Sequence, residues 1–210
     1  MTNQTDLNGD VSEPNDSQQQ PANSKLKNEA IEWVKAIAIA VVLVVVIRWL
    51  VFAPFMVDGP SMQPNFHTGE RVIVNKFLYD FRAPKPGEVV VFHVPQEKRD
   101  YIKRVIAVAG DTVKVQGDDV YVNGKKISEG YIQSQIDEYQ AKGEPYNNLR
   151  DFPNSEVTED KVPEGHIFVM GDNRRNSTDS RMIGYVDLKE VVGRAELVFW
   201  PLNDITIVNH

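Results

Sequence analysis

The sequence predicts a mainly β protein, in which an N-terminal transmembrane helix is followed by an antiparallel all-β core with an inserted subdomain. Three observations predict this fold class. One continuous apolar run lies between residues 33 and 53. From residue 57 onward, short runs rich in Val and Ile are separated by Gly, Pro and Asp. A polar stretch with weak periodicity, residues 130–161, interrupts those runs.

The composition narrows the classes of function. The chain has 210 residues, a formal net charge of -7 and no block of clustered Lys or Arg, so we expect no binding to nucleic acid. It contains no cysteine, which excludes disulfides, thiolate metal sites and a cysteine nucleophile. Its histidines lack the spacing of a metal site, so we expect no metal ion. They are His67, His93, His166 and His210.

The first residues predict a disordered tail, which we place at residues 1–30. Residues 1–24 combine Gln18-Gln19-Gln20 and two prolines with many Asn, Ser and Asp residues, and they contain too few apolar residues to bury a core. They also lack the Arg-rich, acid-poor composition of an organelle transit peptide.

The apolar run Trp33–Ala53 predicts a transmembrane anchor at residues 31–54. The run has 21 residues, close to the roughly 20 that a helix needs to cross a bilayer core. Lys35 and Arg48 interrupt it, but both side chains are long enough to reach the headgroups. A buried core helix and a cleaved signal peptide are alternatives, because the uncharged stretch has only 12 residues. The long polar tail before the run favours an anchor.

The flanking charges predict how the anchor is oriented. Three lysines lie before or at the start of the apolar run, and one arginine lies near its end. Positive residues collect on the cytoplasmic side of a membrane span. We therefore expect a single-pass protein of the cell membrane, with the tail in the cytoplasm and residues 55–210 outside the cytoplasm.

The β core is predicted from seven short apolar runs. The dipeptides Gly117-Asp118 and Asn123-Gly124 tolerate the positive φ angles of hairpin turns. Short strands with close turns are typical of an antiparallel barrel or sandwich. The polar stretch at residues 130–161 predicts an inserted subdomain or a long loop. The expected strands are residues 71–75, 88–92, 101–108, 112–115, 120–122, 166–170 and 197–200.

Two segments of this core suggest catalytic side chains. Ser61 lies between turn-forming Gly59-Pro60 and Pro64, which can hold its hydroxyl in a fixed, exposed position, although such a serine is usually only part of a turn. Lys103 and Arg104 interrupt an apolar strand and point to opposite faces of it. A lysine in apolar surroundings has a lowered pKa and can act as a general base near neutral pH. The alternative is that both cations are solvated on an edge strand.

A dense polar loop, residues 171–181, is a further candidate segment. Long polar loops held at strand ends often carry function. Asp179 and Arg181 can form an ion pair, and Ser177 can donate or accept a hydrogen bond. A calcium-binding loop or a plain connector is the alternative, and the arginines at 174 and 175 weaken the calcium interpretation.

Together these segments resemble bacterial type I signal peptidases of the single-span kind, over roughly residues 31–202. Each motif is short, but their order and spacing are highly specific. The resemblance is carried by Ser-Met-x-Pro at 61–64, Pro-Gly-Glu-Val-Val-Val-Phe at 86–92, Lys-Arg-Val-Ile-Ala-Val-Ala-Gly-Asp at 103–111, and Gly-Asp-Asn with Asn-Ser-x-Asp-Ser-Arg at 171–181.

The resemblance implies a serine endopeptidase, a hydrolase of protein secretion that cleaves signal peptides from exported preproteins through a Ser/Lys dyad. It implies Ser61 as nucleophile, Lys103 as general base and no cofactor. Its partners are the lipid bilayer and secretory preproteins with small residues before the cleavage site, and residues 116–162 fit the insert. The further implied roles are dyad support for Ser177, Asp179 and Arg181, and substrate binding for Met62, Tyr101 and Ile102.

The chain departs from the family pattern at three positions. Gly59 stands where some members have a hydroxyl that helps to bind the oxyanion, so the Ser61 backbone N–H carries more of that task. Arg175 and Met182 replace a common acid and a common aromatic. The rival interpretations are a self-cleaving regulator, a non-enzymatic anchored β domain that binds exported proteins, and an organelle peptidase of the same family. Both dyad residues are present, which disfavours the non-enzymatic domain.

Overall fold

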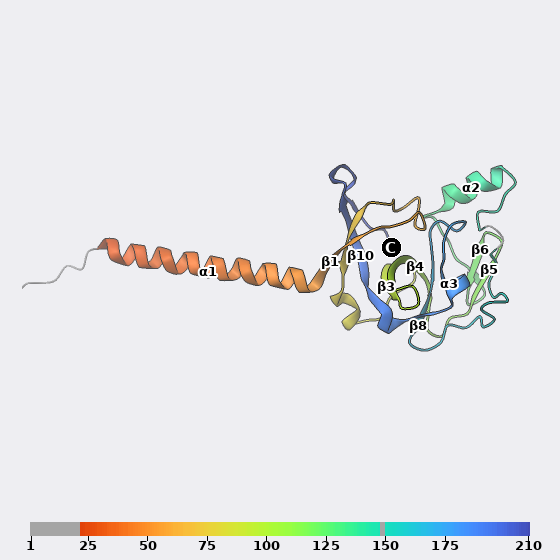
Figure 1. Ribbon diagram of the computed structural model, residues 1–210, viewed down its shortest axis with the longest axis horizontal. Helices are drawn as coiled ribbons and strands as arrows, with labels where there is room; N and C mark the ends of the chain where they lie inside the picture. The colour runs from red at the N-terminus through yellow and green to blue at the C-terminus, as the bar shows by residue number, and fades with distance from the viewer. Residues whose placement is uncertain (1–21, 148–149) are drawn as a thin grey trace, which may run out of the picture. The chain divides into compact units, whose positions relative to one another are not determined.

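The computed structural model describes residues 22–147 and 150–210, and within the first helix it describes side chains only for residues 29–46. The chain divides after Val46, and the unit from Ile47 to His210 contains every described strand (Figure 1). Most of the predicted disordered tail, residues 1–21, lies outside the described residues, so its disorder stays a prediction.

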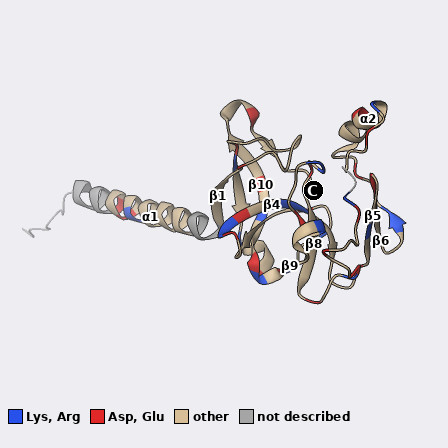
Figure 2. Cartoon of the chain, turned by 45° about the vertical axis from the view of Figure 1, so that its right-hand side comes forward, with Lys and Arg blue, Asp and Glu red and all other residues tan. Residues whose placement is uncertain are grey.

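The apolar run forms a single helix, α1 (Ala22–Val51), whose described side chains are all exposed. The charges in that part lie toward its N-terminal end (Figure 2). In the part of the chain that the structure describes, no helix is both long enough and apolar enough to cross a membrane. The side chains of residues 47–51, with Arg48, lie outside that part. The strand β1 begins at Phe52, inside the segment predicted as the anchor.

The core is one antiparallel sheet with the strand order β1-β2-β10-β3-β4-β8-β9, in which β11 also pairs with β10. The prediction of a mainly β, antiparallel core is confirmed. The hydrogen-bonded path runs from β1 to β9 and does not close into a barrel among the described strands. The strands are β1 (Phe52–Met56), β2 (Arg71–Asn75), β3 (Val89–Val94), β4 (Arg99–Val108), β8 (His166–Met170), β9 (Val186–Asp187), β10 (Val191–Trp200) and β11 (Thr206–Ile207).

The central strands β3 and β4 are buried on both faces, which explains their nearly continuous apolar sequences. Alternate side chains enter different clusters: Val89 and Val91 pack on one face, and Val90 and Phe92 pack on the other. The same alternation sends Lys103 and Arg104 to opposite faces of β4, yet both are buried, with 3% and 2% of their surfaces exposed. The alternative that both cations are solvated on an edge strand is therefore wrong.

The segment between β4 and β8 forms a second, three-stranded sheet and a helix. Both predicted hairpin turns occur there, with positive φ at Gly117 (56°), Asn123 (53°) and Gly124 (74°). The helix α2 lies in the stretch that the sequence shows as polar and weakly periodic. Only Ile136 of its nine residues is buried, so the helix needs no apolar face and its sequence shows no helical period. The elements are β5 (Val113–Gln116), β6 (Asp119–Val122), β7 (Lys125–Lys126) and α2 (Gln133–Ala141).

Short helical turns complete the fold. The helix α3 follows the polar loop, and the Asp179 side chain caps it by accepting a hydrogen bond from the Arg181 backbone N–H. Positively and negatively charged residues both occur along the strands and loops (Figure 2). The remaining elements are α3 (Ser180–Ile183), η1 (Phe77–Asp80), η2 (Leu188–Glu190) and η3 (Leu202–Asp204).

Candidate active site

The fold brings Ser61 and Lys103 together although 42 residues separate them in the sequence. Lys103 lies in the middle of β4, and its Nζ is 2.8 Å from Ser61 Oγ. Nζ also donates a hydrogen bond to the Ile102 carbonyl oxygen at 2.9 Å. Ser61 lies in the turn between β1 and β2 and is partly exposed, whereas Lys103 is buried. A partly exposed hydroxyl thus contacts a buried amine, which is the arrangement that a nucleophile and a general base require.

The turn that carries Ser61 is held by its contacts with the 171–181 loop. The backbone N–H of Asn173 donates to the Ser61 carbonyl oxygen at 3.0 Å, and the Asn173 side chain donates to the Pro60 carbonyl oxygen at 3.2 Å. Gly171 fits against the same turn, because a Cβ there would collide with the Ser61 carbonyl oxygen and with Ser177 Oγ. Gly59 has φ 90°, a conformation that glycine adopts without strain.

The environment of Lys103 favours its neutral amine. Burial lowers the pKa of Lys103 from 10.5 to about 8, against the opposing attraction of the Asp179, Asp172 and Glu97 carboxylates. The centroid of the Tyr101 ring lies 4.8 Å from Nζ. Near pH 8 about half of the Lys103 side chains are therefore neutral and able to accept a proton from Ser61.

Asp179 and Arg181 form a buried bidentate pair, with Arg181 Nε and Nη2 each donating at 2.8 Å to the carboxylate. Burial by itself would raise the pKa of Asp179, but the charge and hydrogen bonds of Arg181 outweigh it and lower that pKa. The Gly171 N–H also donates to this carboxylate, at 3.0 Å. Asp179 thus ties the start of the 171–181 loop to its end.

Ser177 is buried in the same loop, and its Oγ has no hydrogen-bond partner among the described residues. The support of the dyad by Ser177 that the resemblance implies therefore stays a prediction. The loop does not resemble a calcium site either, because its Asp172 and Asp179 carboxylates each bind an arginine. The described residues contain no group of three or more His, Cys, Asp or Glu arranged to hold a metal ion.

Sequence reasoning gave Arg104 no role, yet it forms a buried ion pair behind the site. Its Nε and Nη2 donate to the two Asp172 carboxylate oxygens at 2.9 and 2.8 Å. Its Nη1 donates to the carbonyl oxygens of Gly87 at 2.8 Å and Asn209 at 3.0 Å. Asp172 belongs to the polar loop at residues 171–181 that the sequence singles out. Only the fold identifies Arg104, 68 residues away, as its partner.

A cavity of about 200 Å³ opens over Ser61 and Lys103. Tyr101 and Ile102, two of the predicted substrate-binding residues, line it. Met62, the third, is fully buried in the core and does not line this cavity, so its contact with substrate stays a prediction. The other lining residues are Phe55, Asp58, Gly59, Pro60, Arg99, Asp100, Asn176 and Thr178.

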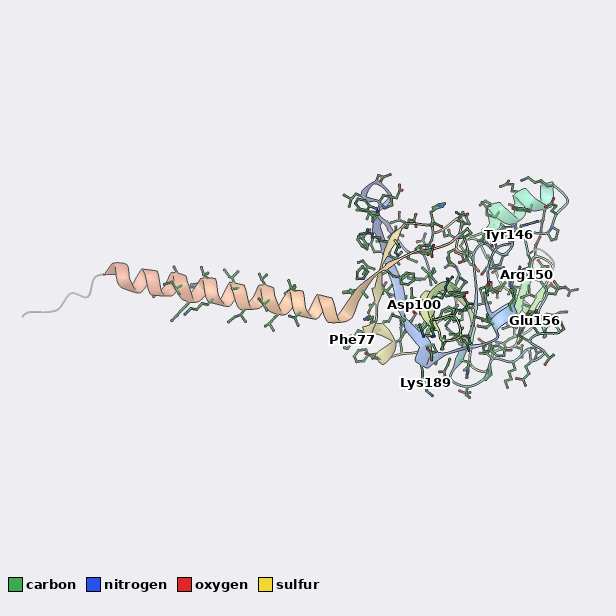
Figure 3. All side chains as sticks on the ribbon, in the orientation of Figure 1. Phe77, Asp100, Tyr146, Arg150, Glu156 and Lys189 are labelled. Atoms are coloured by element: carbon green, nitrogen blue, oxygen red, sulfur yellow. The ribbon has the colours of Figure 1, made fainter. Side chains whose placement is uncertain are left out.

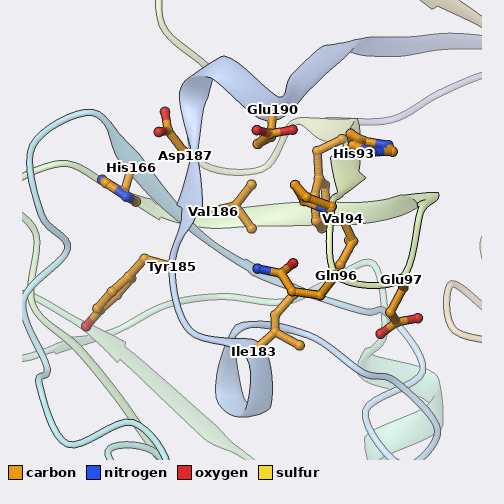
Figure 4. Close-up of a pocket in the computed structure, with 12 residues that line it drawn as sticks. His93, Val94, Gln96, Glu97, His166, Ile183, Tyr185, Val186, Asp187 and Glu190 are labelled. Atoms are coloured by element: carbon orange, nitrogen blue, oxygen red, sulfur yellow. The ribbon is translucent and has the colours of Figure 1, made fainter.

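A larger cavity of about 460 Å³ lies at the turn between β3 and β4 and at residues 183–190, and neither dyad residue lines it (Figure 4). His93, Glu97 and Glu190 are among its lining side chains. Glu97 connects it to the active site, because the Tyr101 hydroxyl donates to Glu97 at 2.6 Å and the Tyr101 ring contacts Lys103.

Known proteins are similar in sequence to this chain over most of its length. A family model described as signal peptidase, peptidase S26, matches residues 30–200. A signal peptidase I of Bacillus licheniformis is 44% identical over 180 residues, which cover 85% of this chain and 93% of that protein. Signal peptidase I S of Bacillus subtilis (strain 168) is 41% identical over 191 residues, covering 89% and 98%. The chain in a crystal structure of a signal peptidase I from Enterococcus faecalis V583 is 34% identical in sequence to this chain. The structural match covers 54% of this chain and 97% of the Enterococcus faecalis chain, with a TM-score of 0.49.

Proposed function

The chain belongs to the signal peptidase family, peptidase S26, and is a serine peptidase of that family, and from this we propose that it is a membrane-bound endopeptidase that removes signal peptides from exported preproteins. We further propose that Ser61 and Lys103 carry out the reaction. The observation that carries this assignment is the 2.8 Å contact between Lys103 Nζ and Ser61 Oγ, together with the burial of that amine.

In the proposed mechanism neutral Lys103 removes the proton from Ser61, whose oxygen attacks the carbonyl carbon of the scissile peptide. The Ser61 backbone N–H donates to the oxyanion that forms. Lys103 then gives its proton to the leaving amine, which releases the mature protein and leaves the signal peptide as an ester on Ser61. A water molecule, deprotonated by Lys103, hydrolyses that ester and restores the enzyme.

The loop residues are proposed to support this dyad. The Asp179–Arg181 pair holds the 171–181 loop against the Ser61 turn, which its buried bidentate geometry supports. Ser177 is proposed to orient Lys103, and the burial of its hydroxyl, which has no hydrogen-bond partner within the described residues, supports that role. A Ser177→Ala variant that keeps full kcat would contradict this role.

The substrate is proposed to be an extended segment of a preprotein with small residues, typically alanine, at the first and third positions before the cut. The small volume of the cavity over Ser61, about 200 Å³, supports a preference for small side chains. The exposed positions of Asp58 and Asp100 at this cavity leave it open to a polypeptide from solvent.

The location is proposed to be the cell membrane, with residues 31–54 as a single-pass anchor, the N-terminus in the cytoplasm and the peptidase domain outside it. The apolar run of the sequence and its flanking lysines support this proposal. Alkaline extraction of membranes tests the anchor: the full chain stays in the membrane pellet, and release into the supernatant would contradict it. Proteolysis of intact protoplasts tests the orientation, because only an outward peptidase domain is digested.

Cleavage of a preprotein with an Ala-x-Ala site by the detergent-solubilised full chain tests the function. We expect the wild type to cut after the second alanine, and Ser61→Ala and Lys103→Met to be inactive but folded, as judged by circular dichroism. The loss should be roughly 10³-fold or more, because nucleophile and base act as one unit. A wild type that leaves every such preprotein intact between pH 6 and pH 10 would overturn the proposal.

A further inference from the structure

A buried ion pair joins the insert, residues 116–162, to the 171–181 loop. Arg174 of the loop binds both carboxylate oxygens of Glu129 of the insert, one of them at 3.0 Å. Only 3% and 5% of these side chains are exposed. Tyr131 completes the contact, since its hydroxyl donates to Glu129 at 2.6 Å and accepts from Arg174 at 3.1 Å.

Arg174 is connected to the backbone of Ser61 in two ways. Its Nε donates to the Gly171 carbonyl oxygen at 3.0 Å, and Gly171 packs against the carbonyl oxygen of Ser61. Its sequence neighbour Asn173 donates a backbone hydrogen bond to the same Ser61 oxygen, at 3.0 Å. The position of the Arg174 guanidinium therefore governs both groups that hold the backbone of Ser61.

Further contacts connect the insert to the same loop, among them three hydrogen bonds of Tyr146, Asn147 and Arg150, and Figure 3 labels Tyr146 and Arg150. The Tyr146 hydroxyl donates to the Asp172 carbonyl oxygen at 2.8 Å, and Arg150 donates to the Ser177 carbonyl oxygen at 2.8 Å. Asn147 accepts a hydrogen bond from Arg181. Among the contacts from the insert, Glu129 contributes a buried negative charge, which makes its contact the most sensitive to a change of one atom.

We propose that Glu129 is a positioning residue for the reaction: through Arg174 it holds the 171–181 loop where Asn173 fixes Ser61, and so it sets the approach of Ser61 to Lys103. The inference rests on the peptidase function proposed above. It gives the insert a part in the chemistry, although no atom of Glu129 touches the dyad.

The first test replaces Glu129 by glutamine in the detergent-solubilised full chain. Glutamine keeps the size of the side chain but leaves the buried Arg174 guanidinium without a carboxylate. We expect kcat to fall roughly 10–100-fold, because a misplacement of about 1 Å has an effect of this size, while KM stays within about twofold of the wild type. Glu129→Asp retains the charge and should recover a large part of kcat.

The matched control is Glu144→Gln, which makes the same substitution at the exposed ion pair between Glu144 and Arg175, 3.1 Å long, on the same loop. Exposed ion pairs contribute little, so kcat and KM should be unchanged. An equal loss of kcat in Glu144→Gln and Glu129→Gln would overturn the proposal, because burial would then not distinguish the two pairs.

The pH profile separates positioning from a loss of folded protein. A displaced loop admits water to Lys103, whose lowered pKa depends chiefly on burial, while the nearby Asp179, Asp172 and Glu97 carboxylates keep their charges. The rise of kcat with pH should therefore move to higher pH in Glu129→Gln. A purely structural role would reduce the amount of folded enzyme and leave the midpoint of this rise where the wild type has it.

A second variant keeps the test decisive if Glu129→Gln does not fold. The double replacement Glu129→Leu with Arg174→Met removes both charges, so no buried charge is left alone. It should recover the wild-type melting temperature but not the wild-type kcat. Full kcat in this variant would overturn the proposal. An inactive wild type, by contrast, would reject the peptidase function itself, whereas an active wild type with normal Glu129→Gln kinetics would reject only the role of Glu129.

Discussion

Two adjacent cations of β4, Lys103 and Arg104, are buried to nearly the same degree but lie in different electrostatic surroundings. On one face, Arg104 donates four hydrogen bonds, two of them to the Asp172 carboxylate. On the other face, Lys103 contacts a hydroxyl and a carbonyl oxygen, and the Asp179 carboxylate that attracts it is itself paired with Arg181.

This difference shows that the partners of a buried cation, rather than burial alone, decide what it does. A guanidinium stays protonated and, with a matched carboxylate, can fix two strands and a loop in place. An amine with neutral partners loses much of its affinity for the proton, which a general base requires. The structural cation Arg104 and the proposed general base Lys103 are thus neighbours in the sequence.

The largest expected effect on activity comes from placing a guanidinium on the Lys103 face of β4, like that of Arg104 on the other face. In Lys103→Arg, a guanidinium replaces the amine and cannot give up its proton near neutral pH. We expect kcat to fall about 10³-fold, the scale of general base catalysis, in steady-state cleavage assays at pH 8. A thermal melt must show a folded variant. Activity within tenfold of the wild type would show that Lys103 is not the base.

Removing the structural cation should affect stability more than any other single change at β4. In Arg104→Met the Asp172 carboxylate stays buried without its partner, which costs about 3–5 kcal/mol. Chemical denaturation of the variant should show this loss. The double variant with Asp172→Asn should regain part of the loss, because the lone charge is gone. If Arg104→Met unfolds at the same denaturant concentration as the wild type, the pair has no structural role.

Replacing Lys103 should have the opposite effect on stability, an increase. The fold lowers the pKa of Lys103 to about 8, so the unfolded chain binds this proton more tightly, and holding the charge in the fold is costly below pH 8. Lys103→Met removes that cost but also two hydrogen bonds, so we expect a gain of roughly 2 kcal/mol at pH 7. The gain should shrink as the pH rises from about 8 toward 10.5, because the charge is then lost in the fold.

The control for this stability change is Lys114→Met, the same replacement at an exposed position of β5. It should alter stability by less than about 0.5 kcal/mol. A Lys103→Met variant that is less stable than the wild type at pH 7 would contradict the idea that the charged amine strains the fold.

The smallest expected effect concerns Glu97, which raises the pKa of Lys103 from a distance and accepts the Tyr101 hydroxyl. Glu97→Gln keeps an oxygen for Tyr101 but removes the charge. The rise of kcat/KM with pH should therefore move slightly toward lower pH, because the protonated amine loses an attractive partner. Asp151→Gln, a charge removal in the insert, serves as the control. A shift toward higher pH in Glu97→Gln would contradict this, because it would mean that the substitution changes the access of water to Lys103 more than the charge near it.

The sequence predicted those parts of the molecule that depend on local patterns. Ser61 and Lys103 lie in short motifs with specific spacing, and β3 and β8 are apolar runs of strand length, so the sequence alone points to all four. The turns at Gly117 and Asn123 followed from residues that accept positive φ.

Features that depend on tertiary contacts were not predictable. Glu129 is one acid among many in a polar stretch, and only the fold places it against Arg174. The helix α2 buries a single residue, Ile136, so no helical period shows in its sequence. Burial of both Lys103 and Arg104 followed from the central place of β4 between β3 and β8, which depends on pairing between distant strands.

Titration of Lys103 by nuclear magnetic resonance tests the central claim most directly. The detergent-solubilised Ser61→Ala variant, with ¹³C at the lysine Cε positions, is followed from pH 6 to pH 12, and Lys103→Met assigns the resonance. The account predicts that the Lys103 resonance titrates with a midpoint near pH 8. A midpoint near 10.5, the ordinary value for lysine, would show that burial on this face of β4 does not produce a neutral base.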